Sequence, residues 1–99
     1  MDAEFTERVL QLVEGIPPGH VLSYGLIAEH LQAGGPRQVG RVMALEGGGV
    51  PWWRVVRADG SLPPSHLPCA LEHYRAERTP LRAGGTAVDM RRAVWTPGT

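Results

Sequence analysis

The strongest constraint on the fold is a run of glycine and proline that separates two short helical patterns. Ser23 suits the N-cap of a helix over 24–31, and Ala33-Gly34-Gly35 ends that helix. Pro36 then opens a second helix, since glycine is favoured just after a helix and proline in its first turn. Two short helices joined by a tight turn, the second of them basic, predict a helix-turn-helix. An ordinary helical hairpin whose arginines face solvent fits the same outline.

The segments on either side predict a mainly α fold with a few β elements. Apolar residues recur at helical spacing from about Asp2 until Ile16-Pro17-Pro18-Gly19 ends the first helix. Val55-Val56 is typical of a buried strand, and Asp59-Gly60 is a turn signal of hairpin type. We therefore expect a single winged helix-turn-helix-like DNA-binding domain over 1–99, with a short β-hairpin or strand elements. Its expected parts are a scaffold helix (1–16), the helix-turn-helix (23–46), a pocket segment and loop (50–68), and a C-terminal helix and tail (69–99).

The C-terminal third predicts one more helix and a short strand. Cys69 to about Glu77 has a helical pattern in which Tyr74 faces the core and Glu77 faces outward. Cys69 fits a small buried residue, and as the chain's one cysteine it cannot form an internal disulfide. Residues 86–90 fit a short strand.

The distribution of charge favours an anionic partner for the middle of the chain. The net charge is zero overall, but it is −4 in residues 1–35, +3 in 36–57 and +1 in 58–99. All ten basic residues are arginine, whose planar guanidinium contacts phosphate and stacks on bases. No apolar run approaches the roughly 18 residues of a membrane span, and no signal peptide is visible. We therefore expect a cytoplasmic protein without a membrane partner.

The second helix of the pair carries the candidate DNA contacts. Three apolar side chains point inward at helical spacing, which leaves the others on exposed faces: Arg37, Gln38, Gly40 and Arg41. Gly40 costs about 1 kcal/mol relative to alanine inside a helix. Close approach of a sugar-phosphate backbone explains this glycine, and so does tight packing against a neighbouring helix.

Pro51-Trp52-Trp53-Arg54-Val55 carries the most specific signal. It stands where O6-alkylguanine-DNA alkyltransferases have Pro-Cys-His-Arg-Val, and the chain resembles the DNA-binding domain of that family from about Phe5 to Tyr74. Further matching motifs occur in the same order, namely Ile16-Pro17-Pro18-Gly19, Val21-Leu22-Ser23-Tyr24-Gly25-Leu26-Ile27-Ala28 and Arg37-Gln38-Val39-Gly40. In those enzymes the cysteine thiolate takes the alkyl group from a flipped-out guanine.

Tryptophan in the cysteine position resembles the alkyltransferase-like proteins, a non-enzymatic branch of this superfamily. Val88-Asp89 followed by Trp95 is also similar to the tail of that branch. The resemblance implies a monomer that binds double-stranded DNA containing O6-alkylguanine and rotates the lesion into a pocket. It further implies that the lesion is left unchanged and passed to damage-recognition proteins of nucleotide excision repair, without a cofactor or a metal.

The resemblance also assigns roles to particular residues. Tyr24 crowds the phosphate 3′ to the target nucleotide, and Arg37 enters the base stack in place of the flipped base. Arg41 is a phosphate contact by its charge, and Arg54 matches an arginine that forms a structural ion pair. The expected lesion pocket has Trp52 as its wall and is completed by Val50, Pro51, Tyr24 and Ser65. If the backbone is extended here, Trp53 points the other way, into the core.

The chemistry of these side chains argues against alkyl transfer. An indole is no nucleophile at neutral pH, and Trp53 replaces the histidine that relays a proton to a glutamate in the enzymes. Two other functions stay open from the sequence. One is a winged-helix transcriptional regulator without lesion specificity, and the other is a residual alkyltransferase that uses Cys69.

Overall fold

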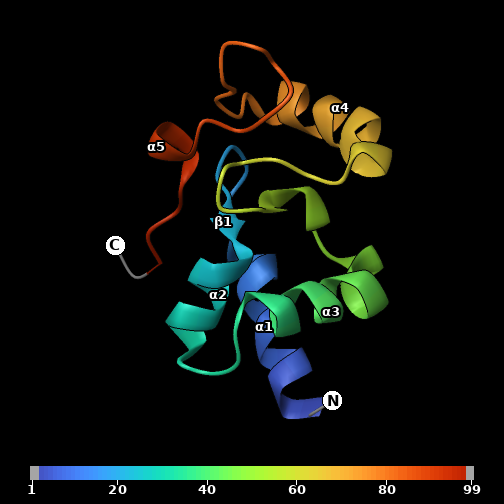
Figure 1. Ribbon diagram of the computed structural model, residues 1–99, viewed down its shortest axis with the longest axis vertical. Helices are drawn as coiled ribbons and strands as arrows, with labels where there is room; N and C mark the ends of the chain where they lie inside the picture. The colour runs from blue at the N-terminus through green and yellow to red at the C-terminus, as the bar shows by residue number, and fades with distance from the viewer. Residues whose placement is uncertain (1–2, 98–99) are drawn as a thin grey trace.

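The computed structural model describes residues 3–97, and this part of the chain is mainly helical with one short sheet (Figure 1). The helices are α1 (Ala3–Gly15), α2 (Tyr24–Leu31), α3 (Pro36–Glu46), α4 (Leu67–Glu77) and α5 (Met90–Ala93). The strands are β1 (Leu22–Ser23) and β2 (Val55–Val56), and three 3-10 turns are η1 (Gly47–Gly49), η2 (Trp52–Arg54) and η3 (Pro64–His66). The mainly α prediction is confirmed. Asp2, the expected start of the first helix, lies outside the described residues.

The turn between α2 and α3 forms where the sequence predicts it. The Ser23 side chain accepts a hydrogen bond from the Leu26 amide at 3.1 Å, which caps α2, and Pro36 lies in the first turn of α3. Gly34 has a φ of +64°, and a Cβ built there would lie 2.9 Å from the ring of Phe5 in α1. Glycine is therefore required at this turn both by backbone conformation and by space.

Two hydrophobic cores lie on opposite sides of the two-stranded sheet. The first core packs α1, α2 and α3 together, and the second packs α4, α5 and the loops beside them. Because successive strand residues face opposite ways, Leu22 and Val55 enter the first core while Val21 and Val56 enter the second. Figure 1 shows α1, α2 and α3 at one end of the molecule and α4 and α5 at the other, with β1 between them.

Strands β1 and β2 pair in parallel and do not form the antiparallel hairpin that the turn signal at Asp59-Gly60 suggests. Leu22 pairs with Val55 and Ser23 with Val56 in parallel register. The turn at Asp59-Gly60 does form, with the Gly60 amide donating to the carbonyl of Arg57 at 2.8 Å. Strand β2 precedes this turn, but within residues 3–97 no strand follows it to complete a hairpin. The pairing partner of β2 is distant in sequence, so a local turn signal could not identify it.

Two further expectations for the C-terminal third are wrong. Residues 86–90 form no strand and contribute only an isolated bridge between Leu81 and Val88. Helix α4 begins at Leu67, two residues before the expected start, because a proline is tolerated in the first turn where its missing N–H is not needed. Cys69 is exposed on the first turn of α4 and is not buried, because the buried face of this helix runs through Ala70 and Tyr74.

Gly60→Ala should destabilise the fold by at least about 2 kcal/mol. Gly60 has a φ of +87°, and a Cβ there would lie 2.1 Å from the carbonyl oxygen of Val88, whose amide bonds back to Gly60 at 2.9 Å. Urea unfolding measures the change. Gly84→Ala is the matched control, since the nearest atom to its Cβ is 4.0 Å away and its φ is not in the left-handed region. Equal stability of the two variants would contradict this reading of the turn.

Candidate nucleic-acid interface and base-sized pocket

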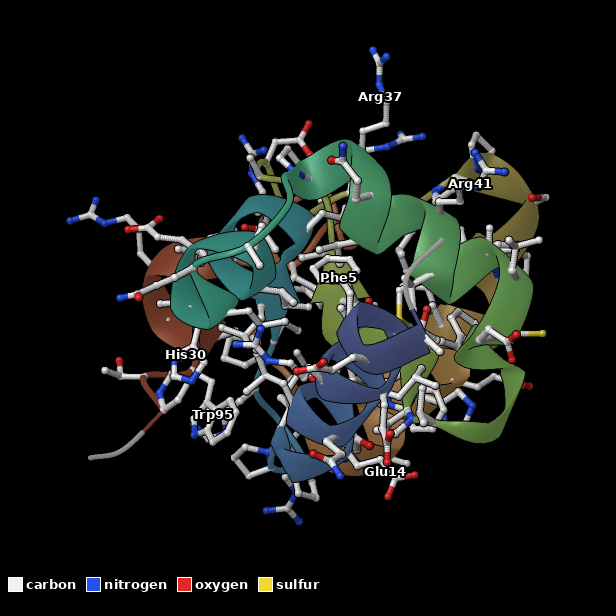
Figure 2. The ribbon with its side chains drawn as sticks, turned by 90° about the horizontal axis from the view of Figure 1, so that it is seen from below. Phe5, Glu14, His30, Arg37, Arg41 and Trp95 are labelled. Carbon is white, nitrogen blue, oxygen red and sulfur yellow. The ribbon has the colours of Figure 1, made fainter. Side chains whose placement is uncertain are left out.

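The outer face of α3 presents the cationic surface that the sequence predicts. Val39 and Val42 are fully buried, whereas Arg37, Gln38 and Arg41 are exposed. Figure 2 shows Arg37 and Arg41 extending from the side of the molecule opposite Glu14 and Trp95. Within residues 3–97 the one ion pair joins two other residues, so both arginines keep their donors for a ligand.

A cavity of about 450 Å³ opens between α3 and the segment that follows β2. This volume lies within the range of pockets that hold a small organic molecule or a nucleic-acid base. Its surface is mostly apolar, which suits a flat aromatic ring. The lining residues are Tyr24, Gly40, Met43, Ala44, Gly47, Gly48, Trp52, Leu62, Pro63 and His66.

The structure brings part of the predicted pocket together and leaves part of it out. Tyr24 and Trp52 line the cavity as expected, and Gly40, predicted as a DNA contact, lines it too. Val50 instead packs on the first core and lines a separate hollow beside α1. Pro51 and Ser65 are not among the described residues that line this cavity, so the place of Val50, Pro51 and Ser65 in the lesion pocket stays a prediction.

The walls that sequence reasoning missed come from three places, one of which is the turn η1 with Gly47 and Gly48. Helix α3 contributes Met43, which the sequence pattern predicts to point inward, and Ala44, for which it makes no prediction. The proline-stiffened loop contributes Leu62, Pro63 and His66, whereas the expected lesion pocket includes only Ser65 from this loop. The loop's prolines signalled a rigid wall, but the residue facing the cavity depends on the 3-10 turn at Pro64–His66, which has no clear sequence signal.

The two adjacent tryptophans lie on a tight turn and do not point in opposite directions from an extended strand. Residues Trp52–Arg54 form a 3-10 turn, so the alternation expected for Trp53 does not apply. The two ring centroids are 5.7 Å apart at an interplanar angle of 86°, and both rings pack partly buried against the second core. His66 and His73 also meet Trp52 edge to face, with centroids at 5.6 and 6.1 Å. These contacts fix the plane of the Trp52 wall.

Trp53 and Arg54 anchor the turn to α4 through one carboxylate. The Trp53 ring stacks on His73 at 3.5 Å, and its Nε1 donates to Glu77 Oε1 at 2.9 Å. Arg54 Nε donates to both Glu77 oxygens at 3.2 Å, a second guanidinium nitrogen forms the ion pair, and Nη1 donates to the Ile16 carbonyl at 2.9 Å. The ion-pair role expected for Arg54 matches these contacts, whereas the outward position expected for Glu77 is wrong.

Two ionisable groups of this region, Glu77 and Tyr24, have pKa values shifted from their usual values. Burial raises the pKa of Glu77, but hydrogen bonds from Arg54, Trp53 and the Gly19 amide outweigh burial and hold that pKa below its usual value. Burial raises the pKa of Tyr24, although the nearby charge of Arg57 opposes the shift. Tyr24 therefore presents a neutral hydroxyl to the cavity at neutral pH.

Between residues 3 and 97 no group of three or more His, Cys, Asp and Glu side chains is arranged to hold a metal ion. No helix in the same range is long and apolar enough to cross a membrane.

The fold and the site together define a helix-turn-helix DNA-binding domain with a base-sized pocket beside its second helix. Residues 4–79 match the family described as 6-O-methylguanine DNA methyltransferase, DNA binding domain, and the chain belongs to this family.

Relatives and solved structures of this family extend the comparison. Over 63 residues the chain is 44% identical to the DNA base-flipping proteins of Escherichia coli (strain K12) and Shigella flexneri, covering 59% of this chain. The match covers 47% of each relative, so the chain spans about half the length of these curated proteins. The fold is also similar to S. pombe Atl1 in complex with damaged DNA containing O6-carboxymethylguanine (24% identity, TM-score 0.82) and to S. pombe ATL in complex with DNA (25%, 0.79). Both likenesses cover 98% of this chain and 99% of the other.

Glu77→Gln should lower the free energy of unfolding at neutral pH. It should also reduce the loss of this free energy as the pH falls. Because the folded pKa of Glu77 is lowered, its carboxylate stabilises the fold above the unfolded value of about 4.3, and this contribution is lost as the pH falls through the folded value. Urea unfolding at steps from pH 7 to pH 3 measures both effects. Glu72→Gln, on an exposed position of α4, is the control and should behave like the wild type. An equal loss of unfolding free energy on acidification in Glu77→Gln and in the wild type would contradict this role of Glu77.

Proposed function

We propose that this protein binds double-stranded DNA containing O6-alkylguanine, rotates the damaged base into the cavity beside α3 and leaves the alkyl group in place. The observation that carries the proposal is Trp52, which walls the cavity at the position where the alkyltransferases have their cysteine. The names of the relatives support base flipping, and the Atl1 complex supports an alkylated guanine as the ligand of this fold.

The cavity favours an alkylated guanine by stacking and by the lower cost of extruding it. An O6 substituent removes a Watson–Crick hydrogen bond, so the damaged base leaves the duplex more readily than guanine. A base placed against Trp52 gains about 1–3 kcal/mol of stacking. The apolar surfaces of Met43 and Leu62 accept the alkyl group without an unpaired polar contact.

The DNA-binding role falls on the outer face of α3 and on Tyr24. In this proposal Arg37 fills the vacated stack, while Gln38 and Arg41 contact the backbone, and the exposure of all three side chains supports these roles. Gly40 supports a close approach of DNA, because a Cβ there would meet the Tyr24 ring at an ordinary 3.9 Å. Packing inside the protein therefore does not require glycine at this position, which leaves close approach by the ligand as its explanation.

The absence of alkyl transfer is part of the proposal. Neither indole of Trp52 and Trp53 can displace an alkyl carbon, and the Glu77 carboxylate is taken up by structural hydrogen bonds. Cys69 is exposed on α4 but is not among the described residues that line the cavity, which disfavours the residual alkyltransferase.

The later fate of the complex follows from the absence of repair. A lesion that is held and not mended has to be passed on, and we propose that damage-recognition proteins of nucleotide excision repair receive it. The proposal includes a cytoplasmic monomer that uses no cofactor.

Trp52→Ala should erase the preference for O6-methylguanine over guanine while salt-dependent DNA binding persists, because the stacking wall is lost and the arginines are kept. Fluorescence anisotropy on matched duplexes measures both affinities. Trp52→Phe is the paired variant and should keep part of the preference, since it retains a flat ring. A wild type that binds both duplexes equally would support the transcriptional regulator, and a preference that survives in Trp52→Ala would place the lesion elsewhere.

Arg37→Ala should cost about 1–3 kcal/mol of lesion binding, because the side chain that occupies the vacated stack is removed. The measurement is the affinity for the O6-methylguanine duplex at fixed salt. Arg82→Ala removes an exposed arginine from the loop that follows α4 and should leave affinity unchanged. This loop lies at the far end of the molecule from α3 (Figure 1). The same affinity for Arg37→Ala and Arg82→Ala would remove Arg37 from this role.

A further inference from the structure

One imidazole, the side chain of His66, is among the described residues that line the lesion pocket. Among the ten lining residues only Tyr24 and His66 are titratable, and burial raises the pKa of Tyr24 so that it stays neutral. Imidazole changes its charge between about pH 5 and pH 8. His66 is therefore the only lining residue able to place a positive charge beside the ligand under these conditions.

We propose that His66 recognises the charge of the O6 substituent. It raises the affinity for guanines whose substituent ends in a carboxylate, increasingly so as the pH falls. This inference rests on the proposed function, since it assigns a substrate class to the same pocket. O6-carboxymethylguanine is the simplest adduct of the anionic class, and O6-methylguanine is its neutral counterpart.

The position of His66 suits this role. It ends the 3-10 turn Pro64–His66, and its ring meets Trp52 at 5.6 Å and 61°, at the wall against which the base would stack. Within residues 3–97 neither ring nitrogen of His66 has a hydrogen-bond partner, so both remain available to a ligand. The side chain is exposed as well as lining, which places it at the mouth of the cavity. A substituent that projects outward from O6 would meet it there.

The elements around His66 supply no competing charge inside the cavity. Helix α3 contributes Gly40, Met43 and Ala44, η1 contributes glycines, and η2 contributes Trp52, none of which is titratable. Helix α2 contributes the neutral hydroxyl of Tyr24. Helix α4 contributes His73, which touches the Trp52 ring at 6.1 Å but stacks on Trp53 and is not among the lining residues. His73 is thus the one rival source of pH-dependent charge beside the pocket.

The sign and size of the effect follow from the charges. A carboxymethyl group is ionised throughout the range from pH 5.5 to pH 8, because carboxyl groups titrate near about pH 4. An imidazolium therefore attracts it at the acidic end, and the attraction is lost as the imidazole deprotonates. Exposed ion pairs are weak, so we expect the preference to change by about three- to five-fold.

The test compares two lesions at each pH, so that general effects of pH on DNA binding cancel. Affinities are measured by anisotropy for duplexes carrying O6-carboxymethylguanine, O6-methylguanine or guanine at one position, from pH 5.5 to 8 at constant ionic strength. The ratio of carboxymethyl to methyl affinity should rise about three- to five-fold on acidification in the wild type. It should stay flat in His66→Gln and rise as in the wild type in His73→Gln and in His30→Gln, a remote residue on α2 (Figure 2).

Several outcomes would overturn the inference. A ratio that is independent of pH in the wild type removes the effect, and a ratio that still rises in His66→Gln removes His66 from it. Loss of the rise in His73→Gln alone assigns the charge to His73 instead. In each of these cases O6-methylguanine remains preferred over guanine and the proposed function stands. If neither lesion is preferred over guanine in the wild type, the proposed function fails and this inference fails with it.

Discussion

The contact between Arg54 and Glu77 joins three segments that the chain order keeps apart. Arg54 lies on the η2 turn, donates to the carbonyl of Ile16 just past α1, and pairs with Glu77 at the end of α4. The two side chains are only 14% and 12% exposed, so breaking the pair would leave a charge poorly solvated. The ion pair therefore ties the first core, through Ile16, to the second core, through α4. Trp53 donates to the same carboxylate, which fixes the turn that carries Trp52.

The cavity lies at the boundary between the two cores, and this explains its character. One wall belongs to α3, which packs on the first core, and the other belongs to Trp52 and the loop up to His66, which pack on the second. Because each wall is fixed by its own core, the pocket is preformed and its cost of ordering is low. Its apolar surface provides area and shape for a base, and under the proposed function it holds that base without a chemical step.

The local features of the fold could be predicted from the sequence. The cap at Ser23, the proline that opens α3 and the buried strand Val55–Val56 each depend on residues within one or two turns of chain. The role of Arg54 came from the family motif, which carries information about a partner that the local sequence does not contain. Trp52 and Tyr24 were placed on the pocket for the same reason.

The features that could not be predicted depend on contacts distant in sequence, or on which face of a helix or 3-10 turn a residue takes. β2 pairs with β1, more than thirty residues earlier, and the turn at Asp59-Gly60 gives no hint of this. The buried face of α4 runs through Ala70 and Tyr74, which leaves Cys69 exposed, and the 3-10 turn at Trp52–Arg54 removes the alternation expected for Trp53. His66 reaches the cavity only because a second 3-10 turn places it there.

The most direct measurement of the central claim is the intact mass of the protein after incubation with duplex DNA containing O6-methylguanine. We predict that the protein mass is unchanged and that O6-methylguanine is recovered in full from the DNA, since Trp52 stands where a thiolate would be needed. A gain of one methyl group by the protein, on Cys69 or on any other residue, with matching loss of the lesion would contradict the account.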